Sequence, residues 1–129
     1  MSHKAALGIW MDHMNAHLIE WTNPILETKI IASGFTHQIK EHTLGEGERV
    51  MHNKEQHEQA AYYKHLGDVI LNYSEILLFG PSDAKTELFN LLKEDSRFSE
   101  IRFQIKPADK MTENQQQAFV RDHFSRRIF

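Results

Sequence analysis

The chain has 129 residues, of which 40% are hydrophobic and 26% charged, a composition typical of one globular domain rather than of a disordered segment. It has no cysteine, which excludes disulfides, cysteine-ligated zinc, iron–sulfur clusters and thiol catalysis. Its net charge of −3 gives no bulk attraction to nucleic acid, and its apolar runs of about four residues are far shorter than a membrane helix. We therefore expect one soluble, cytoplasmic domain over residues 1–129.

The first part of the chain predicts three antiparallel strands. Ala5 to Met11 is apolar and rich in strand formers, and Ala16 to Thr22 alternates between two faces. The intervening Asp12-His13-Met14-Asn15 indicates a turn, because Asp and Asn side chains bond nearby backbone groups. These segments predict a hairpin, followed by a third strand at Glu27 to Phe35.

The chain after residue 54 predicts three helices that alternate with two strands. Each helix has a polar capping residue before apolar residues at helical spacing. The first expected helix has about five turns, is capped by Asn53 and Gln56, and carries the apolar residues Tyr62, Tyr63, Leu66, Val69, Ile70 and Tyr73. A strand at Glu75 to Gly80 follows, and then a helix capped by Ser82 that carries Ala84, Leu88, Leu91 and Leu92. The last two elements are a strand at Ile101 to Ile105 and a helix opened by Thr112 and Gln115 that carries Phe119, Val120 and Phe124. Right-handed crossovers between the later strands predict an α/β fold with a mixed five-stranded sheet, in the order β-β-β-α-β-α-β-α.

A polar segment from Thr36 to Lys54 separates the third strand from the first helix. Gly45-Glu46-Gly47-Glu48 at its centre suits neither a helix nor a core strand, so the segment predicts a long loop, and such loops are often functional. Its three basic and three acidic side chains leave a formal charge of zero. Protonation of His37, His42 and His52 would make it cationic at acidic pH, because histidine ordinarily titrates near pH ~6.5.

The predicted strand-to-helix turn superficially resembles a phosphate-binding loop. It contains Gly80, Pro81, Ser82 and Lys85. Phe79 and Ala84 stand where such a loop needs its two glycines, and Pro81 removes a backbone amide that would bind phosphate. The sequence therefore predicts an ordinary tight turn in which Ser82 caps the following helix.

Histidine and carboxylate side chains leave a metal-dependent hydrolase as an alternative. His52, His57 and Glu58 could contribute ligands, although the two histidines are five residues apart and do not share one helical face. Asp12 would suit a metal-dependent nuclease, but it is better explained as the first residue of a turn. No H-E-x-x-H or G-x-S-x-G motif is present. We therefore predict no catalytic residue and no cofactor.

A cationic group lies at the C-terminal end of the last predicted helix. Arg121, Arg126 and Arg127 could contact phosphate, although basic residues near a helix C-terminus are also stabilised by the helix dipole.

Two motifs occur in a fixed order within a region that spans about Leu7 to Phe124. The first is Trp10-Met11-Asp12-His13 followed by Asn15-Ala16-His17, and the second is the apolar strand Ile76-Leu77-Leu78-Phe79 followed by Gly80-Pro81 and Lys85. Together they resemble the middle domain of the archaeo-eukaryotic peptide-chain release factor and its relative Pelota. They are more similar still to the small bacterial single-domain homologues of that superfamily, sometimes labelled translational machinery or host-attachment proteins.

This resemblance implies a ribonuclease H-like, three-layer fold and a translation-related role. In release factors, the loop after the third strand carries a Gly-Gly-Gln tip that enters the peptidyl-transferase centre and helps water release the peptide. The matching stretch here, Lys40 to Lys54, has Gly45 and Gly47 but no Gly-Gly-Gln. A glutamate at the tip would also place negative charge among RNA phosphates. The resemblance thus implies a ribosome- or RNA-associated protein that is not a peptidyl-tRNA hydrolase.

The residues expected to contact RNA or another partner lie in the polar segment. They are Gly45, Glu46, Gly47, Glu48, Arg49, His52 and Lys54. The near-zero charge of the segment leaves a second interpretation open, a protein–protein interaction module that binds no RNA. Exposed edge strands would also permit a homodimer.

Overall fold

The computed structural model describes residues 5–21, 28–33 and 48–126, and the side chains of 48–56 and 126 are outside that description. The elements in chain order are β1 (Ala6–Met11), β2 (Asn15–Glu20), β3 (Thr28–Ala32), α2 (Glu48–Ile70), β4 (Glu75–Gly80), α3 (Ala84–Leu92), a short 3₁₀ helix (Ser96–Phe98), β5 (Arg102–Pro107) and α4 (Glu113–Arg126). Within the described ranges, no helix is long and apolar enough to cross a membrane.

The strands form one mixed five-stranded sheet in the order β3-β2-β1-β4-β5. β1 pairs antiparallel with β2, and β2 pairs antiparallel with β3. β4 lies parallel to β1 on one side and to β5 on the other. This arrangement confirms the predicted ribonuclease H-like α/β fold and its element order.

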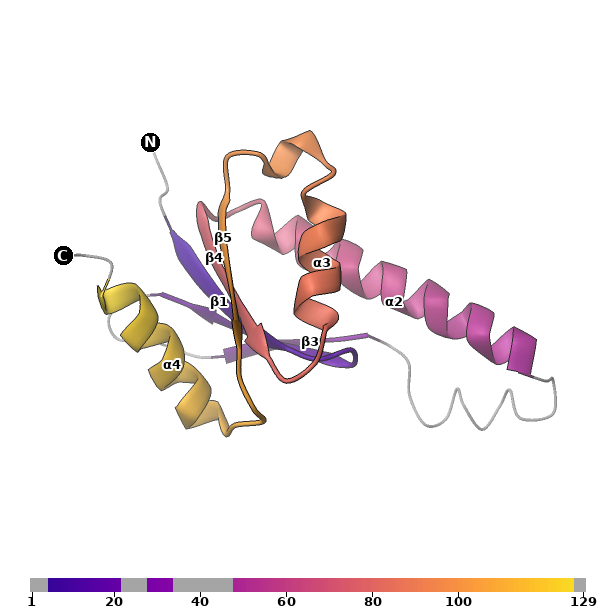
Figure 1. The fold of residues 1–129 in the computed structure, drawn as a ribbon, viewed down its shortest axis with the longest axis horizontal. Coiled ribbons are helices and arrows are strands. Elements are labelled where there is room, and N and C mark those ends of the chain that lie inside the picture. The colour runs from indigo at the N-terminus through magenta and orange to yellow at the C-terminus, as the bar shows by residue number, and fades with distance from the viewer. Residues whose placement is uncertain (1–4, 22–27, 34–47, 127–129) are drawn as a thin grey trace.

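Helices cover both faces of the sheet (Figure 1). α2 and α3 pack on one face, where Tyr62, Leu66 and Leu88 join the larger apolar cluster. α4 packs on the other face, where Val120 and Phe124 join the smaller cluster. All six residues of β1 are buried because β1 lies at the centre of the sheet between these two layers.

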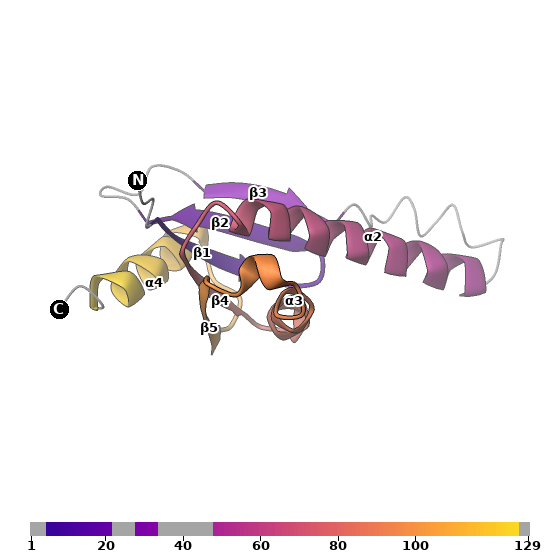
Figure 2. The same ribbon diagram turned by 90° about the horizontal axis from the view of Figure 1, so that it is seen from above.

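The helix α2 is longer than the part of it that the sheet covers. It has 23 residues, which corresponds to about 34 Å, and its N-terminal half extends beyond the sheet (Figures 1 and 2). The structure corrects the expected helix start, since α2 begins at Glu48 rather than after Asn53. Glu48-Arg49-Val50-Met51 tolerate a helix, and a glutamate in the first turn interacts favourably with the helix dipole.

Three further expectations need correction. α2 ends at Ile70, so Tyr73 lies beyond the helix, although it still packs on the larger cluster. The third strand spans Thr28–Ala32 and ends before Ser33, while Glu27, Gly34 and Phe35 of the expected strand lie outside the described residues. Leu91 is 54% exposed, because the buried side of α3 is formed by Ala84, Lys85, Leu88 and Leu92.

The capping predictions for α3 and α4 had different outcomes. At α4, the Thr112 amide donates to Gln115 Oε1 at 2.9 Å, and the Gln115 amide donates to Thr112 Oγ1 at 3.2 Å, which confirms the capping box. At α3, Asp83 rather than Ser82 occupies the N-cap position, and its side chain makes no capping bond. Ser82 Oγ instead accepts from the Ala84 amide at 3.3 Å, within the turn that precedes the helix.

Candidate functional site

The β1–β2 turn is held by its own aspartate and by α2. Asp12 Oδ1 accepts hydrogen bonds from the backbone amides of Met14 and Asn15, both at 2.8 Å, as the turn prediction requires. Tyr62 on α2 donates its hydroxyl to the Asp12 carbonyl at 2.9 Å. Asp12 is therefore a turn residue tied to the helix layer.

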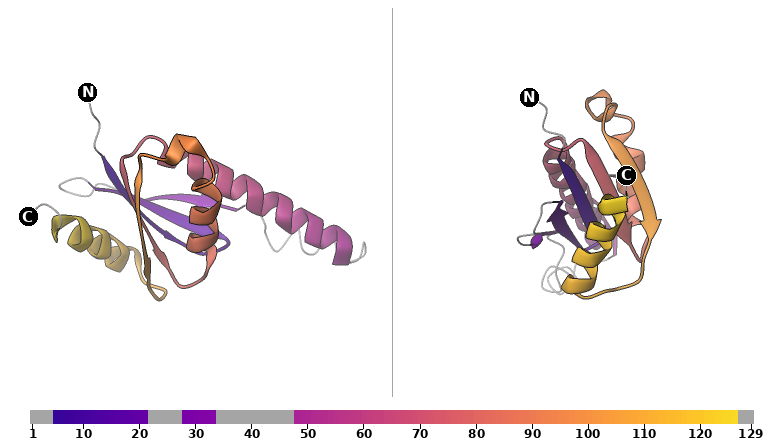
Figure 3. Two further views of the ribbon diagram at one scale, coloured as in Figure 1. Left: turned by 45° about the horizontal axis from the view of Figure 1, so that its top comes forward. Right: turned by 90° about the vertical axis from the view of Figure 1, so that its left-hand side faces the viewer.

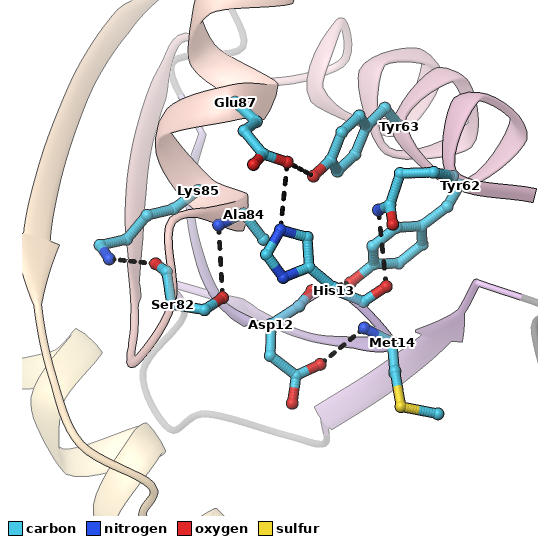
Figure 4. Close-up of polar contacts among 10 residues, drawn as sticks. Asp12, His13, Met14, Tyr62, Tyr63, Ser82, Ala84, Lys85 and Glu87 are labelled. Atoms are coloured by element: carbon cyan, nitrogen blue, oxygen red, sulfur yellow. Dashed lines mark hydrogen bonds and ion pairs between the residues drawn. The ribbon is translucent and has the colours of Figure 1, made fainter. Parts of the chain in front are cut away.

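A polar cluster joins this turn to both helices of the larger layer (Figure 4). His13 Nε2 lies 3.1 Å from Glu87 Oε1 on α3, and Tyr63 on α2 donates its hydroxyl to the same oxygen at 2.7 Å. Gln59 Nε2 donates to the His13 carbonyl at 3.4 Å. Three elements separated in the sequence thus meet at one carboxylate.

The electrostatics of this cluster favour neutral tyrosines. Burial raises the pKa of Tyr62 above its ordinary 10.0, and the negative charge of Asp12 and the neighbouring Tyr63 raise it further. Burial also raises the pKa of Tyr63, which is raised further by the hydrogen bond to Glu87 and by the charge of that carboxylate, while a bond to Gln59 acts in the opposite direction. A nucleophilic phenol needs a lowered pKa, so neither tyrosine is an activated nucleophile. The Tyr62 hydroxyl donates to the turn at Asp12, and the Tyr63 hydroxyl donates to Glu87 on α3.

Replacement of Tyr62 by phenylalanine should change how stability depends on pH. The unfolded Tyr62 loses its proton near pH ~10 and the folded one only at higher pH, so the native state loses stability as pH rises above that value, by up to ~1.4 kcal/mol per pH unit. At pH 8, Tyr62→Phe should cost about 1 kcal/mol through the lost bond to Asp12. Urea unfolding between pH 8 and 11 should show this difference shrinking as pH rises.

Tyr73→Phe provides the control for that experiment. Tyr73 is half-buried, and its hydroxyl lies 3.5 Å from Glu20 Oε1, so it should contribute a smaller part of the alkaline loss. Parallel stability curves for Tyr62→Phe and the wild type would contradict the expectation.

The Gly80–Lys85 turn is closely packed and self-contained. Lys85 is only 7% exposed, and its Nζ donates to the Ser82 carbonyl at 2.6 Å, so its charge is used within the turn. Pro81 is exposed, and Gly80 adopts φ +148 beside the Met11 carbonyl. This geometry agrees with a structural turn and not with a phosphate-binding loop.

The structure changes the setting of the residues predicted to contact RNA. Glu48, Arg49, His52 and Lys54 belong to α2, so they were wrongly placed in a loop, although their side chains are outside the described part of the chain. Gly45, Glu46 and Gly47 lie outside the described residues altogether. The helical residues of this set stand on the portion of α2 that extends beyond the sheet (Figure 2).

The predicted arginine group lies elsewhere. Arg121 is exposed on α4, Arg126 is the last residue of that helix, and Arg127 lies outside the described residues. α4 and the start of α2 stand at opposite ends of the molecule (Figures 1 and 2). The structure therefore does not bring the two predicted RNA-contacting groups together.

The alternative metal site lies partly outside the described side chains. His57 is exposed and Glu58 is half-buried on α2, while the His52 side chain is outside the description. Among the described side chains, no group of three or more histidine or acidic residues is placed to hold a metal ion.

Sequence reasoning missed the cluster around Glu87. Tyr62 and Tyr63 were recognised only as members of an apolar stripe, and nothing in the sequence pairs them with Asp12 or Glu87. One signal was available, since a buried tyrosine hydroxyl usually requires a hydrogen-bond partner.

Two archaeal proteins of known structure share the arrangement described above. The Pelota protein of Thermoplasma acidophilum matches 91% of this chain with a TM-score of 0.59 and 16% sequence identity. Archaeoglobus fulgidus Pelota, whose crystal structure reveals inter-domain structural plasticity, matches 95% with a TM-score of 0.55 and 12% identity. The fold is Pelota-domain-like.

The likeness concerns the fold and one part of those proteins. The chain covers 32% of each of the two Pelota chains, about a third of their length. No protein-family model matches the sequence, and a comparison with curated proteins finds no match. At these identities, a shared activity does not follow from the shared fold.

Proposed function

We propose that this chain is a translation-related, cytoplasmic protein that associates with ribosomes or other RNA, and that it is a single-domain bacterial relative of the release-factor middle domain. One observation carries the proposal: the Pelota-like fold extends over 91–95% of the chain. The sequence motifs around Trp10 and Gly80 point to the same superfamily independently of the fold.

The proposed role is binding rather than peptide release. The segment that would carry the hydrolytic tip has Gly45-Glu46-Gly47 in place of Gly-Gly-Gln. The polar cluster of His13, Tyr63 and Glu87 supplies no activated nucleophile, because the pKa of Tyr63 is raised. We therefore infer a protein that occupies a site on RNA without cleaving an ester there.

The start of α2 is the proposed contact region, together with the segment before it. This part of α2 extends beyond the sheet, where a large partner can approach it without contacting the core (Figure 1). Gly45, Glu46, Gly47, Glu48, Arg49, His52 and Lys54 form the proposed site. Arg121 and Arg126 on α4, at the other end of the molecule, would form a separate phosphate contact together with Arg127, which lies outside the described residues.

Charge reversal at the start of α2 should abolish pelleting with ribosomes. Arg49→Glu combined with Lys54→Glu exchanges two positive charges for two negative ones, and phosphate contacts provide much of the affinity for RNA. We expect the fraction that co-sediments with purified ribosomes at low salt to fall roughly tenfold or more. Far-ultraviolet circular dichroism of the variant checks that α2 remains folded.

The control is a variant with the same change in charge outside the proposed site. Lys93→Glu with Lys110→Glu replaces two exposed lysines and should pellet like the wild type. Unchanged pelleting of the α2 variant, or no pelleting of the wild type, would reject the proposal. A salt titration identifies the alternative protein–protein module, because binding to RNA weakens steeply with ionic strength and an apolar interface does not.

A further inference from the structure

β5 is an edge strand whose outer backbone is unpaired within the described part of the chain. It hydrogen-bonds with β4, where the amides of Arg102 and Ala108 donate to the carbonyls of Ser74 and Gly80 at 3.0 and 3.2 Å. In a parallel pair, alternate residues direct their amide and carbonyl groups to the same neighbour. The backbone groups of the intervening Phe103 and Ile105 therefore point outward.

The side chains of β5 divide between two chemically different faces. Phe103 and Ile105 are half-buried on the face of the sheet that α3 covers. There the Phe103 and Phe89 rings pack edge to face, with their centroids 5.4 Å apart. Arg102 and Lys106 are exposed on the α4 side, about 13 Å apart along the strand. A strand added at this edge would thus meet an apolar face and a cationic face.

The two cations are available to a partner. Among the described residues, neither Arg102 nor Lys106 forms an ion pair. On the same face of the sheet, β4 contributes Glu75 opposite Arg102 and the apolar Phe79 opposite Lys106. Figure 3 shows β5 as the outermost strand of its side of the sheet, with α3 and α4 on opposite faces.

We propose that the free edge of β5 binds an extended acidic peptide by strand addition. The peptide would place two apolar residues opposite Phe103 and Ile105 and exchange backbone hydrogen bonds with them. Acidic residues four positions apart would then stand opposite Arg102 and Lys106. This inference does not depend on the proposed ribosome association, because it uses another surface and another partner.

The charges of β5 select this occupant over a second copy of the chain. Antiparallel self-pairing through Phe103 and Ile105 would place Arg102 of each copy directly opposite Lys106 of the other. Like charges directly opposite each other in a sheet are destabilising. Pro107 has no amide and occupies the next outward position, so it limits the edge to a short partner.

A defined peptide tests the proposal. The probe is the blocked peptide Thr-Glu-Val-Thr-Val-Glu-Thr, with Lys in place of both Glu residues in the first control. The second control is N-methylated at both Val residues, which removes the amides that would bond β5. We expect fluorescence anisotropy to show that each control binds at least about tenfold more weakly than the probe.

Amide hydrogen exchange locates the binding. The amides of Phe103 and Ile105 should exchange rapidly in the free protein and at least about tenfold more slowly with the probe bound, because they then donate to the peptide. The double variant Arg102→Glu with Lys106→Glu leaves the outward backbone groups of Phe103 and Ile105 in place and reverses the charge beside them. This variant should prefer the Lys peptide to the Glu peptide.

Three outcomes would overturn the proposal. In the first, the probe does not bind at all, and in the second, it binds without protecting the amides of Phe103 and Ile105. In the third, the double variant prefers the Glu peptide to the Lys peptide just as the wild type does. Protection that grows with protein concentration alone would assign the edge to a second copy. Protection by an RNA oligonucleotide in place of the peptide would assign it to nucleic acid.

Discussion

Gly80→Ala should destabilise the chain by about 4 kcal/mol or more, which is a large fraction of the free energy of unfolding of an ordinary domain. Gly80 has φ +148, a conformation that residues with a side chain rarely adopt. A Cβ atom at this position would also overlap the carbonyl oxygen of Met11, which belongs to the central strand and cannot move away without breaking the sheet. Urea unfolding followed by circular dichroism measures the loss.

Gly67→Ala is the matched control for this glycine. Gly67 lies inside α2, and a Cβ there would be 3.1 Å from Leu92 Cδ2, the mobile end of a flexible side chain. Alanine gains up to about 1 kcal/mol in helix propensity, which offsets the crowding. We expect a change within ~1 kcal/mol of the wild type. Equal stability of the Gly80 and Gly67 variants would contradict the interpretation of the Gly80 turn.

Gly8→Ala should also destabilise the chain, though less than Gly80→Ala, and a second substitution should rescue part of the loss. Gly8 on β1 lies directly against Val120 on α4, and a Cβ added at Gly8 would overlap the Val120 side chain. Valine in a helix has one strongly preferred rotamer, so Val120 cannot rotate away easily. Overpacking of this kind costs roughly 1–3 kcal/mol.

A double-mutant cycle isolates the contact between Gly8 and Val120. Val120→Ala alone removes buried methyl groups and should cost about 1–3 kcal/mol. In the double variant, the alanine at residue 8 occupies space that the valine leaves, so the two losses should not add. We expect the double variant to be at least about 1 kcal/mol more stable than the sum of the single changes predicts. Additive losses would show that α4 is not held against β1 at this point.

The sequence predicted the sheet because its local signals agreed with one another. The Asp12 turn, the alternation in β2 and the capping box at Thr112 depend on nearby residues, and the structure contains each of them. The start of α2 was misplaced because Asn53 and Gln56 form a plausible cap inside a segment that is itself helical. Leu91 was assigned to the core because helical spacing does not show how wide the covered face of a short helix is.

The polar contacts were less predictable than the fold because they join distant parts of the chain. Glu87 meets His13 from 74 residues away and Tyr63 from 24 residues away, and no local pattern specifies such a meeting. Lys85 has the sequence position of an exposed cation, yet the tight turn brings its Nζ to the Ser82 carbonyl. The unpaired edge of β5 likewise depends on the order of the strands in the sheet, which no local sequence pattern specifies.

The two faces of the sheet are covered by helices from different parts of the chain, so the two faces become covered at different stages of synthesis. The face that carries Trp10, Ile19, Leu77 and Phe79 is covered by α4, whose residues are synthesised after every strand. Until α4 has left the ribosomal exit tunnel, a nascent chain would expose this apolar face of the sheet to chaperones or to other nascent chains. Truncation before Glu113 should therefore yield aggregates rather than a smaller soluble domain.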